Sequence, residues 1–168
     1  TDAVVGGTVS VIGGGKFANG AQTGAFRYLF NESMHGLQVA TVGYGNNNRA
    51  QLKTPLNVDI NENIKEAQNM GYKEWYHAVR NKGKWDYKQL DQQFENFGNY
   101  NFGATARGVG IFGNIPNRGA GWAQGNAGTS KSKWGSFLDW PSDSTSFGDD
   151  PVDQYWINKG KKYYEDNY

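Results

Sequence analysis

The 168-residue chain contains no cysteine, and this absence excludes disulfides, cysteine-ligated zinc and cysteine nucleophiles together. It also lacks any run of about 18 apolar residues, so no segment is expected to cross a membrane. The beginning of the chain does not have the pattern of a signal peptide, because its first basic residue is Lys16 and its apolar stretch is interrupted by glycines. If the domain is exported, we expect the signal to lie upstream in a longer chain.

An excess of positive charge is missing as well. The chain carries 17 Lys and Arg against 16 Asp and Glu, which gives a formal net charge of +1. A protein that grips a phosphate backbone more often has a basic excess, because phosphate neutralisation supplies most of the affinity. The charge balance therefore argues against nucleic acid as the main target.

Histidine is rare, with His35 in the glycine-rich beginning of the chain and His77 in an aromatic segment. A ribonuclease that uses a histidine pair needs both close together, and nothing in the sequence places them so. The glycine-rich pieces IGGGKF and GVGIFG lack the Walker spacing and the Gly-x-Gly-x-x-Gly pattern between a strand and a helix. We therefore expect neither a histidine-pair mechanism nor a bound nucleotide, and no cofactor.

Composition divides the chain into two parts. Residues 1–45 are rich in glycine, alanine and β-branched residues, and we interpret them as a linker segment with a short helix around Ala18–Phe30. Residues 46–168 are the expected main folded domain, whose body begins near Leu52. Aromatic residues make up 15% of the chain while Leu, Ile and Val are few, so we expect an aromatic core.

Helical signals dominate the second part. Asp59 followed three residues later by Glu62 resembles a capping box, and the helix that it begins should end at Gly71. A second short helix is predicted over residues 72–79. Further on, small residues at Gly103, Ala106 and Gly110 would let helices approach each other closely.

The sequence GDDPVDQYWINKGKKYY predicts a terminal helix, with Asp149 or Asp150 as its cap and Pro151 at its first position. Its packed face is expected to carry Val152, Trp156, Lys159 and Tyr163. The fold class that follows is mainly α, of α+β type. It is a compact helical domain with a short hairpin around Trp85–Gln89, and a lysozyme-like arrangement is one candidate.

The stretch WDYKQLDQQFENFGNYNFG, residues 85–103, gathers acids, aromatics and side-chain amides. Asp86 and Glu95 are nine positions apart and could face one cleft if they lie on successive elements. Two carboxyl groups in unlike environments are the usual means of cleaving a glycosidic bond. We predict Glu95 as general acid and Asp86 as its ionised partner, with Lys88 as the third catalytic residue.

Aromatic rings and side-chain amides are a natural lining for a groove that binds sugar. The predicted substrate-binding residues are Trp85, Tyr87, Asn99, Asn101, Asp150 and Asp153. The packing alternative stays open beside this prediction. In that alternative the aromatic residues form the core, Lys88 pairs with Asp86, and Asn99 caps a helix.

The acids of GDDPVD have two interpretations. Asp149, Asp150 and Asp153 could hold a hard cation through their carboxylates. Acids before and within a first helical turn also cap free amides and stabilise the helix macrodipole. We favour capping and expect no metal.

Two pieces of the chain resemble known bacterial families. The sequence GGTVSVIGGGKFANGAQTGAFRYLFN, residues 6–31, resembles the linker that precedes the toxin in Rhs and contact-dependent inhibition proteins. The body from Val58 to Tyr164 resembles the bacterial toxin 44 family of polymorphic toxins. The matching pieces are WDYK (85–88), FENFGNYNFGAT (94–105), AGWAQ (120–124) and GDDPVDQYWINKGKKYY (148–164).

The resemblance implies an effector that a larger carrier chain delivers into a rival bacterium and that a cognate immunity protein neutralises in the producer. The polar residues that match the family pattern are Asp86, Lys88, Glu95, Asn99, Asn101, Asp149, Asp150 and Asp153. The substrate is not implied, although polymorphic toxins are most often nucleases.

Three functions therefore stay open. The favoured one is hydrolysis of peptidoglycan in the target periplasm through the carboxylate pair, without stable membrane insertion. The first alternative is a nuclease in the target cytoplasm, with Lys88, Arg80 or Arg107 on phosphate and an Asp or Glu as base. The second is a non-enzymatic toxin that binds a partner or perturbs a membrane.

Overall fold

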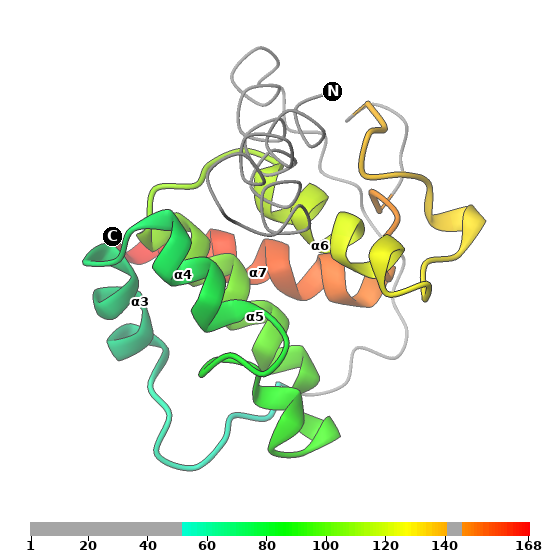
Figure 1. The fold of residues 1–168 in the computed structure, drawn as a ribbon. Coiled ribbons are helices and arrows are strands. Elements are labelled where there is room, and N and C mark those ends of the chain that lie inside the picture. The colour runs from blue at the N-terminus through cyan, green and yellow to red at the C-terminus, as the bar shows by residue number, and fades with distance from the viewer. Residues whose placement is uncertain (1–51, 141–145) are drawn as a thin grey trace, which may run out of the picture.

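The structure is a computed structural model that describes residues 52–140 and 146–168 (Figure 1). These residues form five α-helices and three short 3-10 helices, and they contain no strand. The α-helices are α3 (Ile60–Gln68), α4 (Tyr72–Val79), α5 (Glu95–Gly108), α6 (Ile115–Asn126) and α7 (Pro151–Asn167), and the 3-10 helices are η1 (Tyr87–Gln89), η2 (Gln92–Phe94) and η3 (Ser132–Trp134). The predicted mainly helical fold is confirmed. The predicted linker and its helix around Ala18–Phe30 lie outside the described residues.

Helix starts follow the predicted caps. The Asp59 carboxylate accepts a hydrogen bond from the amide of Asn61 at 2.8 Å and begins α3. The Asp150 carboxylate accepts from the amide of Val152 at 2.8 Å, with Pro151 next to it at the first position of α7. Each cap satisfies an amide that has no partner inside its own helix. Both predictions are therefore confirmed, with Asp150 and not Asp149 as the second cap.

The predicted hairpin around Trp85–Gln89 is wrong. Residues 80–94 instead satisfy their backbone amides locally, through bonds from the amides of Asp86, Gln89, Leu90 and Phe94 to the carbonyl three residues earlier. Such bonds build 3-10 turns and leave no row of amides and carbonyls for a partner strand. The aromatic side chains of this segment pack inward and hold the turns in place.

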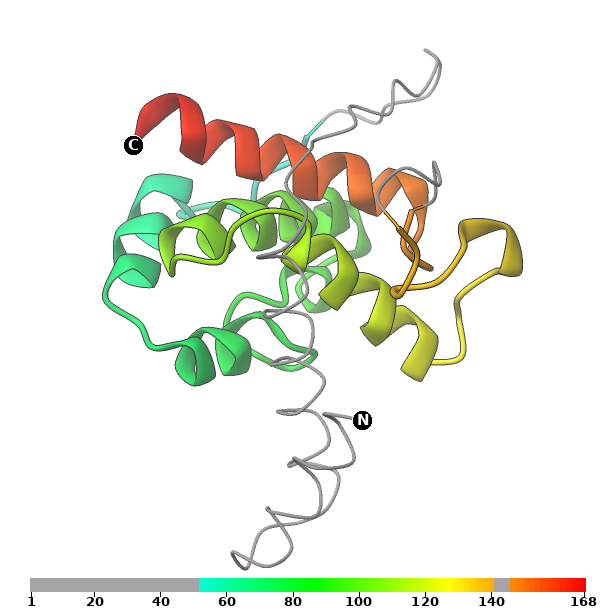
Figure 2. The same ribbon diagram turned by 90° about the horizontal axis from the view of Figure 1, so that it is seen from above.

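Helix α5 is the central element, with α7 on one side and α4 on the other (Figure 2). The indole Nε1 of Trp75 in α4 donates to Oγ1 of Thr105 at 3.0 Å, and this buried bond ties α4 to α5. At the far end of α7, the hydroxyl of Tyr163 donates to the side-chain oxygen of Asn61 at 2.8 Å and ties α7 to α3.

Helices α5 and α7 run parallel with their backbones in close contact. A Cβ added at Gly103 would overlap the backbone of Ile157, and one added at Gly160 would overlap the backbone of Tyr100. Glycine is therefore required on both helices. Asn99 contacts Asp153 near the two N-terminal ends and Arg107 contacts Glu165 near the two C-terminal ends, which fixes the parallel direction. The sequence predicted close approach at Gly103, and the structure confirms it there.

The predicted packed face of α7 is wrong in part. Val152 is 49% exposed and Lys159 is also exposed, while Trp156 is buried as predicted. The buried residues of α7 are Gln154, Trp156, Ile157, Gly160 and Lys161. Two of them are long polar side chains, because the face that meets α5 and α6 also holds a network of side-chain amides.

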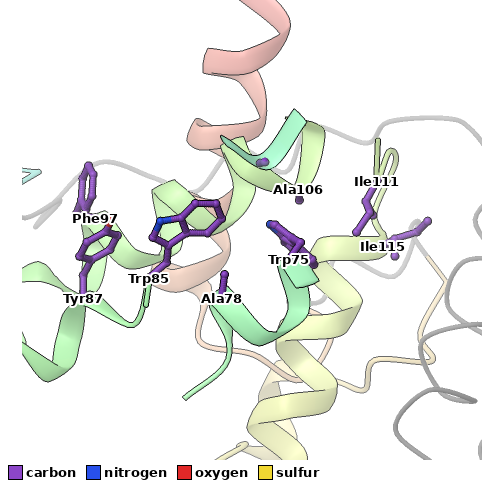
Figure 3. Packing of buried hydrophobic residues seen from close by; sticks show 9 residues of the cluster. Trp75, Ala78, Trp85, Tyr87, Phe97, Ala106, Ile111 and Ile115 are labelled. Carbon is purple, nitrogen blue, oxygen red and sulfur yellow. The ribbon is translucent and has the colours of Figure 1, made fainter. Parts of the chain in front are cut away.

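The core is aromatic, as predicted. Trp75, Trp85, Tyr87 and Phe97 are all buried, and they pack with small or branched aliphatic side chains between α3, α4 and α5 (Figure 3). The rings of Tyr87 and Phe97 meet edge to face with centroids 5.0 Å apart, a favoured arrangement for aromatic pairs. The phenol oxygen of Tyr87 accepts a hydrogen bond from the buried amide of Asn63 at 2.7 Å.

The contact between α5 and α7 predicts the effect of adding one methyl group. Gly103→Ala should lower the free energy of unfolding by about 2 kcal/mol or more, because the new Cβ overlaps backbone that cannot turn aside. Gly98→Ala is the matched control in the same helix, since no atom lies within 4 Å of its added Cβ. That variant should be neutral or more stable by about 0.5–1 kcal/mol through helix propensity. Urea denaturation measures both, and equal stability of the two variants would contradict the described contact.

Candidate carboxylate site

Three carboxyl groups from two separate parts of the chain lie at one end of the α5–α7 pair, where the charges of Asp149 and Glu95 both act on Asp153. Glu95 lies in the first turn of α5, Asp153 in the first turn of α7, and Asp149 in the loop before α7. The side-chain amide of Asn99 on α5 donates to Oδ1 of Asp153 at 2.8 Å and joins the two helices directly. The parallel direction of the helices is what brings their N-terminal turns together.

Asp153 has the most perturbed acidity of the group. Its pKa is raised to about 7, first by burial and then by the negative charges of Asp149, Glu95 and Asp150. The positive charge of Lys88 acts in the opposite direction. A carboxyl group in this environment holds its proton close to neutral pH, which is the property of a general acid.

Asp149 owes its burial to the loop that ends at α7. Gly148 has a left-handed φ of 84°, and the hydroxyl of Ser146 donates to the backbone carbonyl of Asp149 at 2.6 Å, so the chain turns the Asp149 side chain inward. Asp149 is 3% exposed, and Nε2 of Gln154 donates to its Oδ2 at 2.7 Å. Burial raises the pKa of Asp149 to about 6, whereas the bonds from Gln154 and from the Asp150 amide lower it.

Lys88 and Glu95 form the more exposed part of the site. Lys88 lies on η1, which the buried ring of Tyr87 anchors to the core, and its charge lowers the pKa of both Asp149 and Asp153. The carboxylate of Glu95 accepts a hydrogen bond from the side chain of Gln92 at 2.8 Å. One proton-holding acid thus lies beside further carboxyl groups and one lysine.

Of the predicted site residues, Lys88, Glu95, Asn99 and Asp153 come together, with the capping residue Asp150 close to them. Asp86 does not join this group through any of its described contacts. Its Oδ2 accepts from the amide of Lys82 at 2.8 Å and from the side chain of Gln89 at 2.6 Å. The carboxylate therefore closes the turn that contains it.

The other predicted substrate-binding residues lie in the core. Trp85 is 3% exposed and Tyr87 6% exposed, and Asn101 is fully buried with its oxygen accepting from Asn63 at 2.7 Å. This burial agrees with the packing alternative for the aromatic residues and argues against their contact with a substrate. Two other parts of that alternative are wrong. Asn99 lies inside α5 and bonds Asp153, and Lys88 forms no ion pair with Asp86 in the described part of the chain.

Sequence reasoning missed the role of Asp149 and of the amides behind it. Pro151 is the signal that could have found it, because a proline at the first helical position makes Asp150 the cap and leaves the Asp149 side chain free for other contacts. Gln154 and Lys161 gave no such signal, since buried long polar side chains depend on partners far away in the sequence.

Among the described residues, no group of three or more His, Cys, Asp or Glu side chains is placed to hold a metal ion. No helix in the described ranges is long and apolar enough to cross a membrane. Comparison of the chain with protein-family models, curated proteins and solved structures gives no match.

The raised pKa of Asp153 predicts a pH-dependent effect of its replacement. A carboxyl group whose pKa rises from 3.8 unfolded to about 7 folded favours the folded state at low pH, and this contribution is lost as pH rises between those values. Asp153→Asn should therefore gain stability relative to the parent as pH rises, by on the order of 4 kcal/mol between pH 4 and pH 8.

Urea denaturation at several pH values measures this difference. Asp166→Asn, at the exposed end of the same helix, is the control for the change in net charge, because exposed ion pairs contribute little. A difference between Asp153→Asn and the parent that stays constant with pH would contradict the described environment.

Proposed function

We propose that this chain is the toxin domain of a polymorphic effector used between bacteria, and that it hydrolyses the glycan strands of peptidoglycan. One observation carries the proposal. Lys88, Glu95, Asn99 and Asp153 come from three separate sequence pieces that resemble the toxin family, and in the structure they lie at one site. Packing of a core alone would not require charged side chains to lie together in this way.

The chemistry assigned to the site is acid-assisted cleavage of a glycosidic bond. Asp153, which holds its proton near neutral pH, donates that proton to the leaving oxygen of the sugar. The Glu95 carboxylate is the second group. It either stabilises the positive charge that develops on the sugar or takes a proton from the attacking water. The sequence predicted Glu95 as the general acid and Asp86 as its partner. In the proposed mechanism Asp153 is the general acid instead, because its pKa is raised to about 7, and Asp86 has no catalytic role.

Arg107, one of the residues predicted to bind phosphate in the nuclease alternative, has its guanidinium group occupied by contacts inside the fold. Arg107 is buried, its Nε donates to Glu165 at 2.8 Å and its Nη1 to the carbonyl of Ile111 at 2.8 Å. These contacts occupy the guanidinium inside the fold. Lys88 and the exposed Arg80 would have to hold the phosphate groups without it, in a site where carboxylates outnumber cations.

The proposal predicts that purified protein releases soluble muropeptide fragments from isolated cell walls. Asp153→Asn and Glu95→Gln should each lower the rate by about 100-fold or more, the usual range for loss of an acid–base group. Asp86→Asn is the matched control, a carboxylate nearby in sequence whose contacts close a local turn, and it should keep the rate within about 3-fold. Circular dichroism confirms folding of each variant. Walls left intact by the parent protein, or full activity of Asp153→Asn, would overturn the proposal.

The proposed substrate also predicts where the protein is toxic. Expression behind a periplasmic signal should stop growth of a susceptible bacterium, whereas expression in the cytoplasm should not, because the wall lies outside the inner membrane. Co-expression of the cognate immunity protein with its own periplasmic signal should restore growth. Toxicity from the cytoplasm, together with degraded RNA or plasmid DNA on a gel, would decide for the nuclease alternative.

A further inference from the structure

A chain of buried amides leads from the carboxylate site into the protein. Gln154 uses Nε2 twice, donating to Oδ2 of Asp149 at 2.7 Å and to the backbone carbonyl of Asn117 at 3.1 Å. Its Oε1 accepts from Nδ2 of Asn117 at 2.7 Å. Gln154 is buried on α7 and Asn117 is buried on α6, so these bonds also join the two helices.

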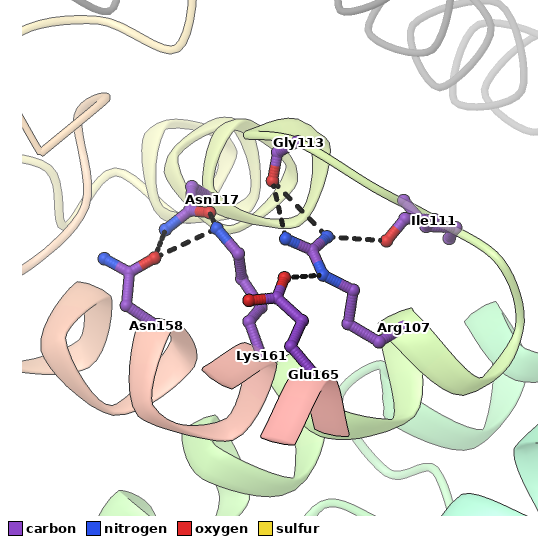
Figure 4. Close-up of polar contacts among 7 residues, drawn as sticks. All are labelled: Arg107, Ile111, Gly113, Asn117, Asn158, Lys161 and Glu165. Carbon is purple, nitrogen blue, oxygen red and sulfur yellow. Dashed lines mark hydrogen bonds and ion pairs between the residues drawn. The ribbon is translucent and has the colours of Figure 1, made fainter. Parts of the chain in front are cut away.

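Lys161 lies at the other end of this series of buried amides. Its Nζ donates to Oδ1 of Asn117 at 2.8 Å and to Oδ1 of Asn158 at 3.0 Å (Figure 4). Lys161 is 8% exposed, and its pKa is lowered to about 7 by burial and by the charge of Arg107, against the charge of Glu165. The side-chain amides of two residues, Asn117 and Gln154, thus connect the buried lysine to the buried carboxylate of Asp149.

The direction of every bond in this chain is fixed by its ends. The charged form of a lysine side chain only donates hydrogen bonds, so Oδ1 of Asn117 faces the Lys161 ammonium group and its Nδ2 faces Gln154. The backbone carbonyl of Asn117 only accepts, so it fixes Nε2 of Gln154 in the same orientation. Gln154 therefore presents a donor, never an oxygen, to Asp149.

We propose that Gln154 is a positioning residue of the site, one that keeps Asp149 ionised and so leaves the proton on Asp153. This inference rests on the proposed function for its meaning in catalysis, while its physical content concerns only which of two carboxyl groups holds the proton. Asn117 and Lys161 act behind Gln154 by holding its amide in one orientation.

The physical reason is the preference of a donor for a charged acceptor. A hydrogen bond to a carboxylate favours the ionised form, and the negative charge of Asp149 then disfavours ionisation of Asp153. Other charged groups act on the same pair, namely Asp150 of the α7 cap, Glu95 of α5 and Lys88 of η1. Each acid also accepts a hydrogen bond from a neutral side-chain amide, that of Gln154 for Asp149 and that of Asn99 for Asp153. Asp149 differs in that the backbone amide of Asp150 bonds it as well, so Gln154 acts together with that amide on Asp149.

The test is a carboxyl carbon NMR titration of Asp149 and Asp153 in the whole protein. In Gln154→Met, which keeps the side-chain length but removes the donor, the Asp149 midpoint should rise by about one pH unit. The Asp153 midpoint should fall at the same time, because its neighbour carries less charge. In the hydrolysis assay the alkaline limb of the pH profile should move to lower pH, because Asp153 loses its proton earlier.

Asn158→Ala is the matched control. Asn158 lies one helical turn after Gln154, is exposed, and bonds the same Asn117 amide at 3.0 Å without touching Asp149. Its removal should leave both midpoints within about 0.3 pH units of the parent, as expected for a group with no direct bond to either acid. If Gln154→Met does not fold, the isosteric Gln154→Glu replaces it. A second carboxyl group beside Asp149 should also raise the Asp149 midpoint.

Unchanged Asp149 and Asp153 midpoints in a folded Gln154 variant would overturn the inference. So would an equal shift in Asn158→Ala. Failure of the proposed function has a different signature, in which the parent protein leaves cell walls intact while the two titrations still respond to Gln154. The two results are therefore distinguishable.

Discussion

The backbone contact between α5 and α7 is the constraint on which the candidate site depends. Gly103 faces the backbone of Ile157 and Gly160 faces the backbone of Tyr100, so the helices meet main chain to main chain. Such a contact fixes the register of two helices, because each glycine fits opposite only one part of its partner. The parallel register then brings both first turns, with their carboxyl groups, to the same end of the molecule.

This arrangement buries charged groups. The side-chain amides of Gln154 and Asn117 offset the free-energy cost of removing these charges from water. A carboxylate or an ammonium group out of water is unfavourable unless hydrogen bonds replace its hydration. Asparagine and glutamine suit both, since the amide nitrogen donates to Asp149 and the amide oxygen accepts from Lys161. The buried side chains of Gln154 and Asn117 connect the two, which explains why α6 and α7 meet through polar as well as apolar groups.

Local features of this fold could be predicted from the sequence, whereas the composition of the site could not. The caps Asp59 and Asp150 act on amides two residues away, so their chemistry is readable in a short window. The pairing of Asp86 with Glu95 was inferred from short sequence separation, and that separation carries no information on which way a turn points a carboxylate. Asp153 lies far from Glu95 in the sequence, and only the register of α5 against α7 brings the two together.

The asymmetry between the acids therefore comes from burial and from neighbouring charge. The N-terminal ends of two helices favour ionised carboxylates through their partial positive charge. The pKa of Asp153 nevertheless rises to about 7, so burial and the charges of Asp149, Glu95 and Asp150 outweigh both helix ends and Lys88. In the proposed hydrolase, the strength of the acid is then set by how many of its neighbours remain ionised. A neutral amide such as Gln154, which acts on one neighbour alone, can tune that strength without adding any charge to the site.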